Sequence, residues 1–254
     1  MGNPVLSQNQ WQAISAKEGH TAAATMTVTG AVFKTLVLTV VLLGVLGLTW
    51  HQIETTETFF GFAPVQALWV SALAGLGIVF AVYFMPRLAG LLGLLYSAAE
   101  GVVLGVVTFL AEQFAPGEGL PVLAAGLTGC TLLGMLMLYM TGIIRATPMF
   151  VKIVSGALIG LVLMIFGLWI TSMFFPWAAE FRSAIYGSGP IGIGFSLFVV
   201  GLAAFTLVLD FDFIERGSKS GQPKYMEWVA AVGLLVTLVW LYIEILRLLM
   251  KLRR

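Results

Sequence analysis

The sequence has little charge. Of its 254 residues, 10% are charged and 59% are hydrophobic. A soluble domain usually carries about 25% charged residues, so the composition excludes a soluble globular protein and indicates an integral membrane protein. The formal net charge is +1, so no broad basic surface is available for nucleic acid. The lipid bilayer is therefore the partner that we expect first.

Cysteine and histidine are also scarce. A single cysteine, Cys130, excludes an intramolecular disulfide. The two histidines, His20 and His51, lie in a polar tail and a loop, so an intramembrane Ser–His protease would lack its base. HExxH, CxxC and phosphate-binding glycine motifs are absent. We therefore expect no catalytic activity and no permanently bound cofactor.

What the sequence does contain is a series of long apolar runs. Crossing about 30 Å of hydrocarbon takes about 20 residues, and such spans are helical because backbone polar groups in lipid must bond internally. The predicted spans are residues 30–50, 66–84, 88–110, 120–144, 150–175, 189–209 and 228–249. The sequence thus predicts an all-α fold. We expect a seven-transmembrane helical bundle that forms one domain (residues 30–252) after a polar tail (residues 1–29).

The loops suggest an orientation for these spans. Lys and Arg gather at residues 86–87, 145–152 and 216–224, in alternate loops. Because basic loops favour the cytoplasm, we expect a cytoplasmic N-terminus and an outer C-terminus. The basic residues that oppose this pattern are Arg247, Lys251, Arg253 and Arg254. Either the last segment does not fully cross, or acidic partners and the outer interface hold its charges, and its length favours a crossing.

Two spans contain charges at depth. A charge at the centre of a bilayer helix costs about 2.5–3.5 kcal/mol, and such residues persist when they pair or line an ion path. In the last span Glu244 and Arg247 are three positions apart, so they can pair along the helix. In the third span Glu100 is the other deep acid. It is either hydrogen-bonded to Tyr or Ser, ion-paired with Arg247, or part of an ion pathway.

Two more acids end the sixth span. Asp212 is explained by a solvated helix end and is a secondary candidate. Asp210 lies between Leu209 and Phe211, which favours a partly buried carboxylate. A desolvated carboxylate takes up a proton more readily than one in water, and carboxylate oxygens are ligands for calcium. Asp210 is therefore our candidate for proton sensing and for transient metal binding.

Small residues recur at four-residue spacing in several spans. Such spacing lets helices approach closely. The positions are Ser71/Gly75, Gly101/Gly105, Gly126/Cys130/Gly134 and Gly156/Gly160. We interpret them as packing positions rather than functional ones.

Several short motifs resemble those of a known family. The sixth span ends in Val208-Leu209-Asp210-Phe211-Asp212-Phe213-Ile214, and the last contains Leu241-Tyr242-Ile243-Glu244-Ile245-Leu246-Arg247-Leu248-Leu249. Weaker matches are Glu100-Gly101-Val102-Val103-Leu104-Gly105 and Asn3-Pro4. In this order they resemble bacterial Bax-inhibitor-type (YccA-like) membrane proteins, over roughly residues 30–249.

The resemblance implies a bundle in which the other helices surround the last one, in a bacterial cytoplasmic membrane. It also implies a pH-sensitive calcium leak in which two acids on the last two helices form the proton-sensing pair. By motif these acids are Asp210 and Glu244. Other members are linked to a membrane-bound quality-control protease, so the alternative is a non-conducting regulator of such a protease.

The depth of each acid in the membrane decides whether Asp210 and Glu244 can contact each other. Asp210 lies at the inner end of its span, whereas the helix from Trp228 to Glu244 rises by roughly 24 Å at about 1.5 Å per residue. We therefore expect no direct Asp210–Glu244 bond. Instead we predict that Glu244 and Arg247 interact with Glu100 and that Asp210 has another partner near the inner face.

Overall fold

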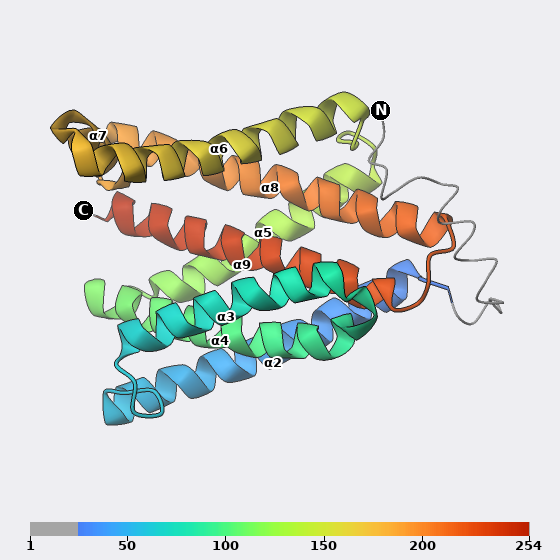
Figure 1. Ribbon diagram of the computed structural model, residues 1–254, viewed down its shortest axis with the longest axis horizontal. Helices are drawn as coiled ribbons and strands as arrows, with labels where there is room; N and C mark the ends of the chain where they lie inside the picture. Colours follow the sequence, from blue (N-terminus) through green and yellow to red (C-terminus); the bar gives the residue numbers. More distant parts are fainter. Residues whose placement is uncertain (1–24, 254) are drawn as a thin grey trace. The chain divides into compact units, whose positions relative to one another are not determined.

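The computed structural model describes residues 25–253. Most of the predicted tail, with His20 and Asn3-Pro4, and the last residue, Arg254, lie outside the described residues. Within residues 25–253 the regular structure is helical, apart from two isolated β-bridges. Figure 1 labels the helices from α2 near the start of the chain to α9 at its end. The all-α prediction is confirmed.

Seven of these helices are long and apolar enough to cross a membrane. They are α2 (Val28–Thr56), α3 (Pro64–Phe84), α4 (Ala89–Phe114, after the 3-10 turn Pro86–Leu88), α5 (Leu120–Met140), α6 (Pro148–Phe174), α8 (Pro190–Lys219) and α9 (Met226–Leu252). The remaining helix, α7 (Pro176–Tyr186), is too short to span. The predicted number of spans is confirmed, while the exact bounds of the spans stay a prediction.

The helix ends follow local chemistry. Pro148 and Pro176 each stand at the first position of a helix, where the missing N–H has no helical acceptor to lose. The hydroxyl of Thr147 accepts a hydrogen bond from the backbone N–H of Phe150 at 3.2 Å and caps α6. These signals make α6 begin two positions before the predicted start of its span.

The helix that contains the sixth span is longer than the predicted span. Helix α8 continues beyond Leu209 to Lys219, into the segment that we expected to be a basic loop. The continuation carries two ion pairs at four-residue spacing, Arg216 with Asp212 and Lys219 with Glu215. Such pairs support an exposed helix end in water. Hydropathy reports the apolar part of a helix and misses this charged extension.

The chain groups into two compact units. Unit 1 comprises Met1–Gly105 and Asp212–Leu235, and unit 2 comprises Val106–Phe211 and Val236–Arg254. Helices α4, α8 and α9 contribute residues to both. The expectation of a single domain over residues 30–252 stays a prediction.

In unit 1, α2 and α4 approach closely at two glycines. A Cβ on Gly101 would lie 2.7 Å from the backbone oxygen of Leu42. A Cβ on Gly105 would lie 2.6 Å from the Cβ of Thr49. Only a residue without a side chain fits at such separations. The predicted packing role of this glycine pair is confirmed.

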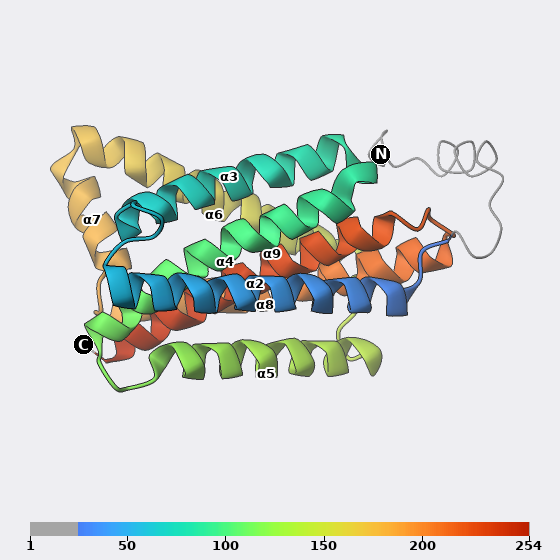
Figure 2. The same cartoon turned by 90° about the horizontal axis from the view of Figure 1, so that it is seen from below.

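In unit 2, α6 and α8 share an apolar core. Its buried members are Val154, Leu161, Val199 and Leu202, and Trp240 of α9 packs against them. Figure 2 shows α7 turning back from the end of α6. The glycines of α5 and α6 differ from those of α4, because a Cβ on Gly126, Gly134, Gly156 or Gly160 would meet no atom of residues 25–253 within 4 Å. The predicted packing role is wrong at these four positions.

The seven long helices differ in burial. In its most apolar stretch α9 has 67% of its residues buried, the largest share of the seven, whereas α6 has 11%. A helix with that much buried surface faces protein more than lipid. This burial agrees with a central last helix, although the central position itself stays a prediction.

Candidate functional site

Asp210 on α8 forms a hydrogen bond with the side chain of Thr237 on α9, and both residues belong to unit 2. A carboxylate can only accept, so the Thr237 hydroxyl donates. The other carboxylate oxygen, Oδ2, is buried and has no hydrogen-bond partner among the described residues. The partner of Asp210 is thus a neutral residue on the last long helix.

A buried carboxylate oxygen without a partner is costly, since its lost hydration is not replaced. A proton on the carboxyl group would remove the charge, and a bound cation would neutralise it. Within residues 25–253, no group of three or more His, Cys, Asp or Glu side chains is arranged to hold a metal ion. A calcium ion at Asp210 would therefore need carbonyl oxygens or water for its other ligands.

Glu244 and Arg247 form the expected pair along α9. The Nη1 atom of Arg247 donates to both carboxylate oxygens of Glu244, at 2.7 and 2.9 Å. Glu244 is buried, so the adjacent guanidinium offsets a charge that would be costly alone. Both oxygens of Glu244 are thus engaged by Arg247, while Asp210 is engaged by Thr237.

Glu100 lies in unit 1 and has a local partner. The hydroxyl of Tyr96, one turn earlier on α4, forms a hydrogen bond with its carboxylate. Gly75 of α3 borders the same group, because a Cβ there would lie 2.9 Å from Glu100 Oε1. Of the alternatives left open for this residue, the hydrogen bond to a tyrosine is the one observed. Its interaction with Glu244 and Arg247 stays a prediction.

Asp212 pairs with Arg216, with 2.6 Å between Oδ2 and Nη2. The arginine side chain is exposed, as expected for a solvated helix end. This contact agrees with the solvated helix end that explains Asp212, and Asp210 stays the first candidate in the sixth span.

Sequence reasoning missed a buried charge cluster in unit 1. Glu227, at the start of α9, is only 1% exposed and forms an ion pair with Lys34 of α2. Its Oε1 accepts from the backbone N–H and the hydroxyl of Thr27, at 2.9 and 3.0 Å. The Lys34 ammonium also lies 5.2 Å from the ring centroid of Trp228. The available signal was a lone cation in the first apolar run and a lone acid at the start of the last.

The basic residues at the end of α9 also have partners in unit 2. Lys251 is buried and donates to the backbone oxygens of Ile185 and Gly192, at 2.8 and 2.9 Å. Arg253 forms an ion pair with Glu118 at 3.0 Å. Arg253 thus has an acidic partner, as one of the two explanations expects, whereas Lys251 is held by backbone carbonyls. Whether the last segment crosses fully stays a prediction.

Comparison with known proteins bears on the whole chain. A model of the family described as Bax inhibitor 1 like matches residues 3–254. No match was found among curated proteins or among solved structures. The match takes in α8 with Asp210 and α9 with Glu244, as the sequence motifs implied. The chain is a multi-pass membrane protein and belongs to the Bax inhibitor 1 like family.

Proposed function

We propose that this protein is a pH-sensitive leak channel for calcium ions and carries out no covalent chemistry. We place it in a bacterial cytoplasmic membrane with its N-terminus in the cytoplasm. The observation that carries the proposal is the Asp210 carboxylate, which has one oxygen bonded to Thr237 and the other buried without a partner.

Protonation is the proposed trigger. When Asp210 is ionised, the Thr237 hydroxyl donates a charge-assisted hydrogen bond that links α8 to α9. Such bonds are about twice as strong as neutral ones. When Asp210 takes up a proton, its hydrogen bond with Thr237 weakens. The carboxyl group is then neutral and no longer attracts cations. The relative position of the two helices then changes the ease with which a cation passes.

The other candidate acids have supporting roles in this proposal. Glu244 is the second acid of the sensing pair that the resemblance implies, and it forms an ion pair with Arg247 along α9. Glu100, hydrogen-bonded to Tyr96, is a third acid whose protonation could alter the pathway. A calcium ion would interact with these carboxylates transiently, as cargo.

The test is calcium flux into proteoliposomes, from about pH 5 to about pH 8, a range in which desolvated carboxylates can titrate. Wild type is compared with Asp210→Asn, Glu244→Gln and Glu100→Gln. We expect a pH-dependent flux in wild type and a pH-insensitive flux in Asp210→Asn. The matched control is Asp212→Asn, which removes the same charge from an ion pair at the solvated helix end and should retain the wild-type pH profile.

An alternative is a non-conducting regulator that binds a membrane quality-control protease or another integral partner. Folded wild-type protein that gives no flux above empty liposomes would favour it. A wild-type pH profile in Asp210→Asn would instead leave the leak intact and move the sensor to Glu244 or Glu100.

A further inference from the structure

A pocket of about 610 Å³ lies in unit 2, lined by residues of α6, α7 and the start of α8. Its walls are mainly apolar and aromatic, with Val162, Phe166 and Trp169 from α6 and Phe195 from α8. The volume falls within the range of about 300–1,000 Å³ that is usual for small-molecule sites. Neither the candidate acids nor their partners line this pocket.

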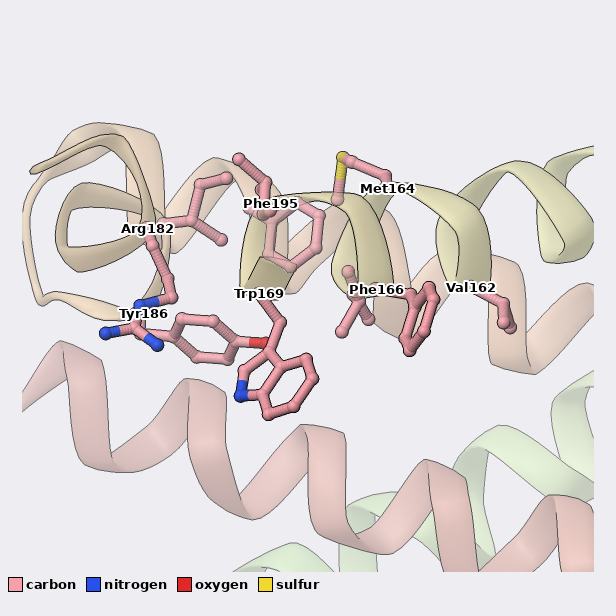
Figure 3. Close-up of a pocket in the computed structure, with 10 residues that line it drawn as sticks. Val162, Met164, Phe166, Trp169, Arg182, Tyr186 and Phe195 are labelled. Carbon is pink, nitrogen blue, oxygen red and sulfur yellow. The ribbon is translucent and has the colours of Figure 1, made fainter. Parts of the chain in front are cut away.

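Polar groups gather at one end of it. Figure 3 shows Arg182, Tyr186 and Trp169 toward one end, with Phe166 and Val162 toward the other. Their donors are a guanidinium, a phenol hydroxyl and an indole N–H. Within the described part of the chain, none of these three side-chain donors has a hydrogen bond or ion pair. Three side chains whose donors have no partner among the described residues therefore line one apolar pocket.

The polar end lies where a span ends. Helix α6 finishes at Phe174 and α7 starts at Pro176, and the rings of Phe175 and Trp177 pack together there, 6.3 Å apart. Aromatic residues are enriched at the interface between the membrane and water. Val162 precedes Trp169 by seven positions, or roughly 10 Å of helix. The pocket thus extends from the headgroup level into the hydrocarbon region.

A buried lysine of α9 contacts the segment that carries the pocket residues of α7. The buried Lys251 ammonium donates to the carbonyl of Ile185, a pocket residue, and to that of Gly192. This cation fixes the turn between α7 and α8. The acid nearest to Arg182 in the sequence is Glu180, which is exposed and does not line the pocket. It lies two positions from Arg182, and helical side chains at this spacing do not face each other. The polar end therefore has positive character.

We propose that this pocket binds an anionic phospholipid, with one acyl chain against Val162 and Phe166 and the phosphate at Arg182. Arginine binds phosphate through paired, charge-assisted hydrogen bonds. The Tyr186 hydroxyl and the Trp169 N–H donate to the phosphate or ester oxygens. The site does not depend on the proposed leak.

The test uses the full-length protein in detergent, with added phosphatidylglycerol or phosphatidylcholine of identical acyl chains, and native mass spectrometry of the bound lipid. We expect wild type to retain phosphatidylglycerol about tenfold better, the ratio expected from one charge-assisted contact. Arg182→Gln should abolish this preference. The matched control, Lys152→Gln, removes one positive charge from an exposed residue in the first turns of α6, away from the pocket, and should keep it.

Two further variants protect the test against misfolding. Trp169→Phe and Tyr186→Phe keep an aromatic ring and remove one donor each, so each should lower retention of phosphatidylglycerol by about three- to tenfold. Soluble glycerol 3-phosphate should compete poorly, because it lacks the acyl chain. Equal retention of both lipids by wild type, an unchanged preference in Arg182→Gln, or efficient competition by glycerol 3-phosphate would each overturn the proposal.

Discussion

Lys34 and Glu227 form a buried ion pair in unit 1 although they are 193 positions apart in the chain. The pair ties α2 to the start of α9. Thr27, the N-cap of α2, donates to the same carboxylate. A Cβ on Gly30 would clash with that carboxylate, so only glycine fits beside Glu227 in the first turn of α2.

Removing one partner of this pair should strongly destabilise the protein. Lys34→Met leaves a buried carboxylate without its cation, and we expect a loss of about 3–5 kcal/mol in the free energy of unfolding. The double variant Lys34→Met/Glu227→Leu should recover much of that loss, because neither charge remains. The measurement is unfolding in detergent micelles followed by circular dichroism.

The control for this prediction is Lys219→Met. It breaks the exposed pair with Glu215 and should cost less than about 1 kcal/mol. Equal losses for Lys34→Met and Lys219→Met would contradict the structural role that we assign to the buried pair.

The Asp210–Thr237 hydrogen bond makes a second prediction. Thr237→Val keeps the shape of the side chain but removes the hydroxyl that donates to Asp210, so we expect a loss of about 1–3 kcal/mol. Thr237→Ser keeps the hydroxyl and should stay close to wild type. The same unfolding assay measures both, and a double-mutant cycle with Asp210→Asn should show coupling between the two sites. A serine variant as unstable as the valine variant would argue that packing, not the hydroxyl, matters at position 237.

The glycines of α4 provide a third prediction. In Gly101→Ala the new methyl group would lie 2.7 Å from the backbone oxygen of Leu42, and a backbone atom cannot move aside cheaply. We expect a loss of about 1–3 kcal/mol from overpacking. Gly134→Ala is the matched control, since nothing lies within 4 Å and alanine favours a helix by about 1 kcal/mol. The thermal midpoints should shift in opposite directions, and similar shifts would refute the close α2–α4 contact.

Much of the fold could be predicted because hydropathy and helical periodicity are local properties. The seven spans follow from apolar runs of sufficient length, and the Glu244–Arg247 pair follows from three-residue spacing. The exception is the end of α8, where Asp212–Arg216 and Glu215–Lys219 extend the helix beyond the apolar run. Along-helix charge pairs carry that information, and a hydropathy count ignores it.

The sequence by itself determined the class of the protein, the number of its spans and its family, because these depend on composition and on short motifs in order. Only the tertiary structure decided which groups the buried charged side chains contact. Thr237 for Asp210, Lys34 for Glu227 and the carbonyls of α7 and α8 for Lys251 join distant segments. Hydropathy specifies which residues enter the membrane. Which of their polar groups then meet depends on the packing of helices that are far apart in the chain.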